Sequence, residues 1–294
     1  MDAGGKFLMD NSPLRRQVSN IKKATGLGWD IIEQDYVLSW VLFGISKIEK
    51  LKSTLVFKGG TALKKCYFGN YRFSQDLDFS VQGAHPKGDE LLSLLSEACR
   101  LAADAADTIE LQCKRYAVKD PHPEEQEAFE IRAQLPWQRE FLTVVKVEVT
   151  TREHLLLKPI EKSIIHGYGE SLEGTIFTYQ LEEIIAEKVR AILQFAKKLH
   201  ERTWARSRVR DYYDLWRIFH EYGEQIDKAA LPALAKQKCE NKSIKFDSVE
   251  QLFQSVLTEH LVEWNRWLSS VVPNLPEKDT VISELRVQLE EIFG

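Results

Sequence analysis

The sequence lacks the marks of several common protein classes. Its four cysteines, Cys66, Cys99, Cys113 and Cys239, show neither paired nor metal-type spacing, so we interpret them as reduced thiols in a cytoplasmic protein. The seven histidines also lack metal-ligand spacing. The P-loop, the dinucleotide-binding glycine motif and the serine nucleophile elbow are absent. These absences argue against disulfide-rich domains, zinc sites, P-loop enzymes and serine hydrolases.

Long apolar runs and an excess of positive charge are also missing. The most apolar stretch, residues 36–45, is too short to cross a bilayer, and the first residues lack the apolar core of a signal peptide, so we expect no membrane association. The formal net charge of −4 argues against general coating of nucleic acid but permits a local basic surface. With 44% hydrophobic residues among 294, the chain can bury a sizeable core in one large domain or two smaller ones.

The residues that are present divide the chain into two parts. Hydrophobic periodicity predicts an α/β (α+β) part with a small mixed sheet over residues 1–165, followed by a helical part over residues 166–294. In the first part we expect strands at 53–57, 72–79, 109–118, 129–135 and 141–150, and helices at 29–50, 61–68 and 91–106. In the second part we expect helices at 181–200, 206–221, 228–240, 247–271 and 278–293.

A glycine pair, Gly59-Gly60, follows the apolar strand predicted at 53–57. Glycine lets the backbone approach a ligand closely. We expect the next helix to begin at Thr61, which would cap it, and a helix N-terminus presents N–H groups to an anion. The segment therefore predicts a phosphate-binding turn.

Two aspartates with i,i+2 spacing, Asp76 and Asp78, lie on the strand predicted at 72–79. Their side chains should point to one face, roughly 6.6 Å apart along the chain, and Ser74 should share that face. Mg²⁺ commonly binds one or two carboxylates together with substrate phosphates, and a pair of such ions can hold the attacking and leaving oxygens of a phosphoryl displacement. The alternative is an acidic edge strand near a turn.

Glu148 is the best candidate for a third metal ligand. In the strand predicted at 141–150, valines alternate with Lys146, Glu148 and Thr150, which would occupy the opposite face. That face could line a catalytic cleft. Alternatively it is an exposed strand face carrying a Lys–Glu neighbour pair.

Lys188 falls within the apolar stripe of the helix predicted at 181–200. A lysine there either extends its ammonium group to solvent or needs an anion, for which a nucleotide phosphate would serve. Farther along the chain, Asp211 could accept a proton from an attacking hydroxyl, or it could hold Lys188 or an arginine in place.

Residues 188–210 carry eight Lys or Arg residues against one acid, Glu201. A solvated helix face with its loop is one explanation, and a surface for a phosphate-rich acceptor such as RNA is the other. In the second case the predicted RNA contacts are Lys197, Lys198, Arg202, Arg206, Arg208 and Arg210.

Together these segments resemble a known family, the AbiEii/AbiGii-type nucleotidyltransferase toxins of bacterial type IV toxin–antitoxin and abortive-infection systems. The likeness rests on residues 57–63 (FKGGTAL), residues 72–79 (RFSQDLDF), the pair Glu187-Lys188 and residues 210–215 (RDYYDL). It covers roughly residues 50–220. It implies a fold like that of the DNA polymerase beta nucleotidyltransferase superfamily, with a helical C-terminal half.

The resemblance also implies an NTP substrate, Mg²⁺, an antitoxin partner and an RNA acceptor, the tRNA 3′ end in characterised relatives. By this likeness Asp76 and Asp78 hold metal, Lys188 contacts the triphosphate and Asp211 completes the active site. We expect the nucleotide to contact Gly59, Gly60, Thr61, Lys64 and Ser74 as well. The wider superfamily usually has Gly-Ser where this chain has Gly-Gly-Thr, so Thr61 could replace the serine hydroxyl or only cap the helix.

Two other functions fit the same residues. A nucleotidyltransferase of this kind could modify a protein or a small molecule instead of RNA. A non-catalytic module with this fold could bind a partner without Mg²⁺-dependent NTP binding.

Overall fold

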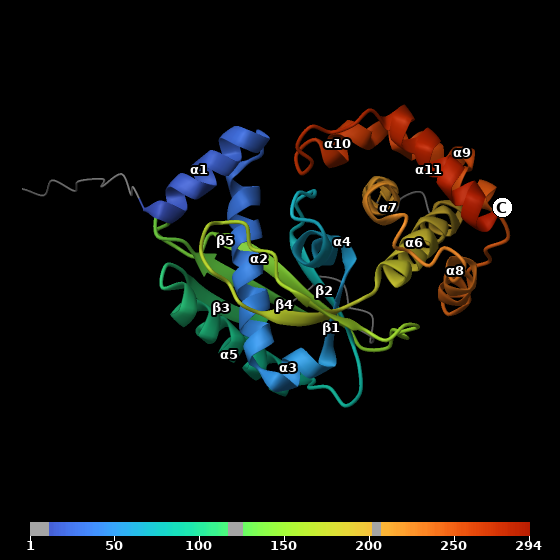
Figure 1. Ribbon diagram of the computed structural model, residues 1–294. Coiled ribbons are helices and arrows are strands. Elements are labelled where there is room, and N and C mark those ends of the chain that lie inside the picture. Colours follow the sequence, from blue (N-terminus) through green and yellow to red (C-terminus); the bar gives the residue numbers. More distant parts are fainter. Residues whose placement is uncertain (1–11, 117–125, 202–206) are drawn as a thin grey trace, which may run out of the picture. The chain divides into compact units, whose positions relative to one another are not determined.

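A computed structural model describes residues 12–116, 126–201 and 207–294 of the chain (Figure 1). The chain divides into two compact units. Unit 1 comprises Met1–Phe57, Thr61–Glu153 and Lys162–Ile176. Unit 2 comprises Lys58–Gly60, His154–Glu161 and Phe177–Gly294. Each unit is described by itself below.

The structure contains one mixed sheet of seven strands in the order β3-β4-β5-β2-β1-β7-β6. The strands are β1 (Leu55–Lys58), β2 (Asp76–Val81), β3 (Glu110–Arg115), β4 (Gln126–Gln134), β5 (Thr143–Thr150), β6 (Ile160–Ser163) and β7 (Thr175–Thr178). β2 pairs with β5 in parallel, whereas β4 pairs with both β3 and β5 in antiparallel fashion. β4 and β5, which pair in antiparallel fashion, contain most of the strands predicted at 129–135 and 141–150.

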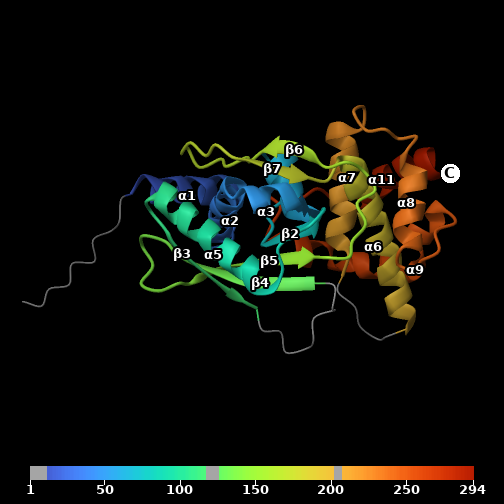
Figure 2. The ribbon, with the colours of Figure 1, turned by 90° about the horizontal axis from the view of Figure 1, so that it is seen from below.

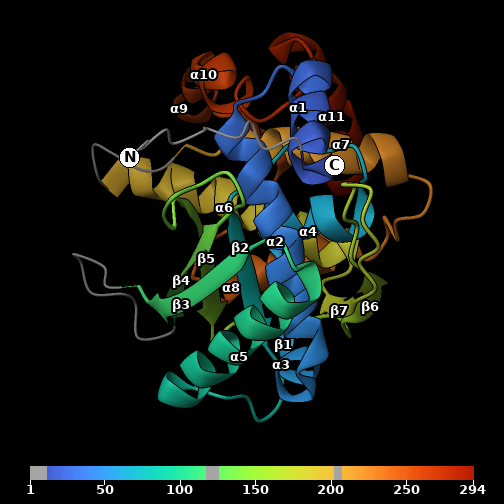
Figure 3. The same ribbon diagram turned by 90° about the vertical axis from the view of Figure 1, so that its left-hand side faces the viewer.

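The helical segments between residues 13 and 106 belong to unit 1, except that the first two residues of α4 belong to unit 2. They are α1 (Pro13–Thr25), α2 (Trp29–Lys47), α3 (Glu49–Thr54), α4 (Gly59–Ala62), the π-helix η1 (Leu63–Tyr67) and α5 (Gly88–Ala106). α2 packs against α5 and β5, and α5 packs against β3 (Figure 3). The close approach of α2 and α5 needs Gly44, because a side chain there would collide with the carbonyl oxygen of Ala98. On the sheet, Leu77, Phe79, Val147 and Val149 are fully buried.

Unit 2 is mainly helical. Its elements are α6 (Leu181–Glu201), α7 (Val209–Tyr222), α8 (Leu231–Glu240), the 3₁₀ helix η2 (Val249–Phe253), α9 (Ser255–Thr258), the 3₁₀ helix η3 (Glu259–Glu263), α10 (Trp264–Leu268) and α11 (Lys278–Phe293). α6 packs against α7 and α8, and α11 contacts both of these helices (Figure 2). None of the helices in the described part of the chain has the length and apolar character needed to span a bilayer.

The single helix predicted at 247–271 is wrong. Ser248 and Gln251 form a capping box at the start of η2, but Gln254 has an extended backbone (φ −58°, ψ 151°) that ends the helical turn. The buried Leu252 and Leu257 are five residues apart, a spacing that one regular α-helix does not place on a single stripe. Short helical pieces bury these residues instead. The helix predicted at 29–50 also ends early, at Lys47.

Candidate active site

The glycine turn leads directly from strand into helix. Gly59 has φ +77°, a left-handed conformation that favours glycine, and α4 begins at this residue. Thr61 therefore lies inside the helical segment, and our prediction that it caps the helix is wrong. Its side chain is fully buried, and its hydroxyl donates a 2.5 Å hydrogen bond to the backbone carbonyl oxygen of Asp76. This bond ties the start of β2 to the helix that follows the turn.

The two aspartates lie on the polar face of the sheet, as the i,i+2 spacing predicts. Asp76 is level with Lys146 in the parallel pairing of β2 and β5, and Asp78 is level with Glu148. All four side chains are half-buried. Ser74 precedes β2, so the strand geometry that we used to place it beside the aspartates does not extend to it. The structure thus sets Glu148 next to Asp78 on the neighbouring strand.

The donor set on this face suits a hard cation. Glu148 accepts a 2.6 Å hydrogen bond from the side chain of Gln126 on β4. Among the described residues, no three His, Cys, Asp or Glu side chains are grouped so that they could hold a metal ion by themselves. Carboxylate oxygens that share their cation with substrate phosphates are nevertheless the usual Mg²⁺ ligands in phosphoryl-transfer sites. Asp76 and Asp78 fit such a shared arrangement.

Lys188, in unit 2, is held by two carboxylates of α7. Its ammonium group lies 2.9 Å from Asp211 Oδ1 and 2.5 Å from Asp214 Oδ2, and the residue is 6% exposed. Lys188 therefore does not extend to solvent, and Asp211 holds it in place. A guanidinium nitrogen of Arg208 lies 3.5 Å from the other oxygen of Asp211. Burial raises the pKa of Asp211, but Lys188 and Arg208 outweigh this effect and lower that pKa overall.

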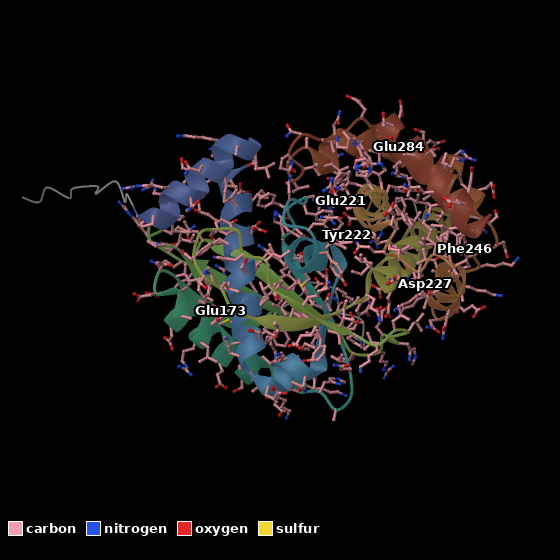
Figure 4. All side chains as sticks on the ribbon, viewed as in Figure 1. Glu173, Glu221, Tyr222, Asp227, Phe246 and Glu284 are labelled. Carbon is pink, nitrogen blue, oxygen red and sulfur yellow. The ribbon has the colours of Figure 1, made fainter. Side chains whose placement is uncertain are left out.

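Helix α7, which supplies these carboxylates, is fixed by contacts with its neighbours in unit 2. Trp216 donates a 2.7 Å hydrogen bond to Glu284 of α11, one of the side chains labelled in Figure 4. Tyr212 donates one of 2.5 Å to the carbonyl oxygen of Leu252. Asp214 is fully buried. The Lys188 pairing is thus part of a rigidly packed helix interface.

A family model shows which protein family the chain belongs to. The model described as "Nucleotidyl transferase AbiEii toxin, Type IV TA system" matches residues 40–286. The chain belongs to the AbiEii family. This match confirms the resemblance found in the sequence and assigns the chain to the nucleotidyltransferase toxins of type IV toxin–antitoxin systems.

The fold of this AbiEii-family chain is similar to that of a solved structure. That structure is MenT4, a nucleotidyltransferase toxin from Mycobacterium tuberculosis H37Rv, and the two chains compare with a TM-score of 0.62 and 21% sequence identity. The similarity covers 96% of this chain and 87% of that chain. The predicted fold class, an α/β part with a mixed sheet and a helical C-terminal part, is confirmed. The comparison with curated proteins found no match.

The basic segment of the AbiEii-family chain is only partly described. Lys197 and Lys198 are exposed on α6, and the Lys197 ammonium donates a 3.3 Å hydrogen bond to the carbonyl oxygen of Ser243. Arg208 and Arg210 are half-buried near the start of α7. Arg202 and Arg206 lie outside the described residues. Four of the six predicted RNA contacts therefore have a described position, and their role stays a prediction.

Sequence reasoning missed a buried charge cluster in unit 1. The Lys64 ammonium lies 3.9 Å from Asp35 Oδ1 and 3.9 Å from the centre of the Phe73 ring. Lys65, which is 1% exposed, lies 2.8 Å from Asp35 Oδ2. All four consecutive residues from Leu63 to Cys66 in this π-helical turn are buried, so the turn is covered on more than one side. Lys64 is thus tied to a carboxylate in the core, and its contact with nucleotide stays a prediction.

Proposed function

We propose that this AbiEii-family chain transfers a nucleoside monophosphate from Mg²⁺–NTP to the 3′ end of tRNA, which blocks translation. The observation that carries the proposal is the pair Asp76 and Asp78 on one accessible face, with Glu148 level with Asp78. The hydrogen bond from Thr61 fixes this pair relative to the helix after the glycine turn. An NTP substrate and a tRNA acceptor would place the reaction in the cytoplasm.

Asp76 and Asp78 would hold Mg²⁺ together with the phosphates of the nucleotide. When bound, the ion neutralises the charge that develops on the phosphates during transfer. Glu148 as a third ligand stays a prediction. If it is one, Glu148→Gln should weaken activation by Mg²⁺ more than Gln126→Ala, which removes only the hydrogen-bond partner of Glu148.

In unit 2, Gly59, Gly60 and Lys188 would bind the triphosphate. Asp211 and Asp214 fix the direction of the Lys188 ammonium group. The lowered pKa of Asp211 makes it a weak base at neutral pH, so its pairing with Lys188 and Arg208 supports a positioning role over proton acceptance. The acceptor hydroxyl would attack the α-phosphate as the bond to pyrophosphate breaks, with positioning and electrostatics supplying most of the acceleration.

The acceptor would be RNA held by Lys197, Lys198 and the arginines of the basic segment. Family membership implies an antitoxin partner, and an antitoxin that restored protein synthesis in cells would agree with the proposed toxicity. The acceptor is tested by incubating the protein with each of the four α-labelled NTPs and separate pools of tRNA, protein and small metabolites. Label in tRNA alone supports the proposal, label in protein or metabolites supports the alternative acceptors, and no label with any pool supports a non-catalytic module.

A further inference from the structure

A row of charged side chains crosses the polar face of the sheet in unit 1. Strands β3, β4, β5 and β2 lie side by side in this order (Figure 3). Lys146 of β5 is level with Asp76 of β2 on one side and with Glu130 of β4 on the other. Glu130 is in turn level with Lys114 of β3. Residues that are level on paired strands share one face of the sheet, so Lys146 is the cation of this row that adjoins a proposed metal ligand.

Glu130 already pairs with two other cations. Its Oε1 atom lies 3.1 Å from the Lys114 ammonium and 2.7 Å from Nε of Arg132. Hydrogen bonds from Arg132 and Lys114 outweigh the opposing effect of burial and lower the pKa of Glu130, so its carboxylate is ionised at neutral pH. The charge of Glu130 is thus balanced by Lys114 and Arg132 and does not depend on Lys146.

The Lys146 ammonium group lies over an aromatic ring instead. It is 4.6 Å from the centre of the Tyr116 ring. Within the described part of the chain, no carboxylate oxygen lies within ion-pair distance of this ammonium group. Oppositely charged side chains that are level on neighbouring strands commonly pair, and Asp76 is so placed. The contact with Tyr116 therefore keeps the ammonium group of Lys146 apart from the carboxylate of Asp76.

Tyr116 reaches Lys146 across the strand that separates them. Its backbone N–H donates a 3.0 Å hydrogen bond to the carbonyl oxygen of Ala128, which extends the pairing of β3 with β4 by one residue. Ala128 is level with Glu148 of β5. Because Ala128 has only a methyl side chain, the tyrosine ring can extend over β4 toward β5. The sheet thus holds a half-buried lysine on an aromatic ring, beside the carboxylates of β2 and β5.

We propose that Lys146 binds the RNA acceptor at the phosphodiester that precedes its 3′-terminal nucleoside, and that Tyr116 is a positioning residue for the Lys146 ammonium group. This inference rests on the proposed function. A lysine ammonium binds phosphate as a compact point charge, which suits a backbone phosphate of RNA. Without the Tyr116 ring, the same ammonium group would pair with Asp76 and compete with Mg²⁺ for that carboxylate.

The order of the strands favours the acceptor over the nucleotide as the ligand of Lys146. β2, which carries both aspartates, has β1 on one side and β5 on the other. β1 leads into the glycine turn, where the triphosphate would bind, whereas Lys146 lies on β5. In phosphoryl transfer the attacking and leaving oxygens are roughly in line, on opposite sides of the phosphorus. With pyrophosphate leaving on the side of β1, the acceptor approaches on the side of β5.

The two substrates of the transfer assay should respond differently to the loss of Lys146. Lys146→Met should raise KM for tRNA by roughly tenfold, the effect of losing one hydrogen bond to a charged group, and leave KM for Mg²⁺–NTP unchanged. Lys114→Met is the matched control, since Lys114 lies in the same row but pairs with Glu130. A KM for Mg²⁺–NTP that rises, or a KM for tRNA that does not, would overturn the inference.

The positioning role of Tyr116 is tested through the Mg²⁺ requirement. Tyr116→Leu removes the ring and lets Lys146 pair with Asp76, so it should raise the Mg²⁺ concentration for half-maximal transfer several-fold. Adding Lys146→Met should return that concentration to the wild-type value, and Tyr116→Phe, which keeps the ring, should preserve it. A folded Tyr116→Leu variant with an unchanged Mg²⁺ requirement, or a raised requirement that Lys146→Met does not reverse, would overturn this role.

A modified acceptor tests the same contact from the side of the RNA, by filter binding without NTP. Transfer RNA with a neutral methylphosphonate in place of its last phosphodiester should bind the wild-type protein more weakly than unmodified tRNA does. Lys146→Met should bind both RNAs equally, because the cation is already absent. An equal loss in the two proteins, or none in either, would overturn the inference. Wild-type protein that shows this dependence on Lys146 but transfers no nucleotide would instead refute the proposed function.

Discussion

Thr61 of α4 donates its hydroxyl to the backbone carbonyl oxygen of Asp76, the first residue of β2, over 2.5 Å. This bond joins the helix after the glycine turn to the strand that carries the two aspartates. A side chain that the sequence assigned to capping or phosphate binding therefore orients the strand that carries the two proposed metal ligands. The bond explains how a hydroxyl group is accommodated at a fully buried position.

Replacing Thr61 by valine preserves its shape but removes the hydroxyl. We expect Thr61→Val to lower the free energy of unfolding by about 1–3 kcal/mol, the cost of leaving a buried acceptor without its partner. Transfer activity should fall as well, because β2 loses an anchor at Asp76. Thr61→Ser, which retains the hydroxyl, is the control. Urea unfolding and the transfer assay check both effects, and equal stability of Val and wild-type proteins would show that the bond is unimportant.

Variants of the ion pair between Lys188 and Asp214 distinguish an effect on folding stability from an effect on transfer activity. Lys188→Met leaves the fully buried Asp214 without its closest cation and should cost about 3–5 kcal/mol of folding free energy. The double variant Lys188→Met/Asp214→Leu removes both charges and should recover most of that stability. It should not recover transfer, since Lys188, the cation that we propose to bind the triphosphate, is still missing. A double variant with restored activity would contradict the role of Lys188.

Because Lys65 is buried, we expect the folding stability of the protein to depend on pH in an unusual way. Burial lowers its pKa to about 8, although the neighbouring Asp35 opposes the shift and Lys64 reinforces it. Between about pH 8 and the ordinary lysine pKa of about 10.4, the unfolded chain binds more protons than the folded one, so stability rises with pH. Relative to Lys65→Met, wild-type protein should gain about 2 kcal/mol between about pH 7.5 and 9.5.

Urea unfolding at a series of pH values measures this gain. The pH series should stop below pH 10 because burial raises the pKa values of Tyr36, Tyr168 and Tyr212 in the folded protein. At higher pH these tyrosines lower the stability of the folded protein and so act against the gain from Lys65. Parallel profiles for wild-type and Lys65→Met proteins would show that Lys65 titrates normally.

The basic segment predicts a salt effect on acceptor binding. The exposed Lys197 and Lys198 should each release counterions from bound RNA, so Lys197→Gln/Lys198→Gln should reduce the slope of log K against log [salt] by about 1 to 2. Lys236→Gln/Lys242→Gln, which removes the same charge from the region of α8, is the control. Filter binding of tRNA at several salt concentrations measures the slope. Equal slopes for the two double variants would argue that α6 does not bind RNA.

Local patterns in the sequence predicted most of the regular elements. The alternation of valines with polar residues gave the face of β5 on which Glu148 lies, and α11 was predicted at its observed bounds. The apolar stripe of α6 placed Lys188 at a buried position. These features depend on the period of a single strand or helix, which the sequence expresses directly.

Features that depend on distant residues were not predictable in this way. The partners of Lys65 and Lys238 lie 30 and about 50 residues away, and no local period connects them. We predicted that both glycines would form the turn and that the helix would begin at Thr61, with Thr61 as its cap. In the structure the positive φ of Gly59 allows the helix to begin at Gly59 itself. Register between β2 and β5, which sets Glu148 beside Asp78, likewise requires the folded sheet.

The most direct measurement of the central claim is transfer of labelled nucleotide to total tRNA by wild-type, Asp76→Asn and Asp78→Asn proteins, with and without Mg²⁺, for each of the four NTPs. Circular dichroism and thermal unfolding would establish that the variants are folded. We expect Mg²⁺-dependent labelling by the wild-type protein and its loss in both variants. Full labelling by a folded Asp76→Asn or Asp78→Asn variant would contradict the role of these carboxylates.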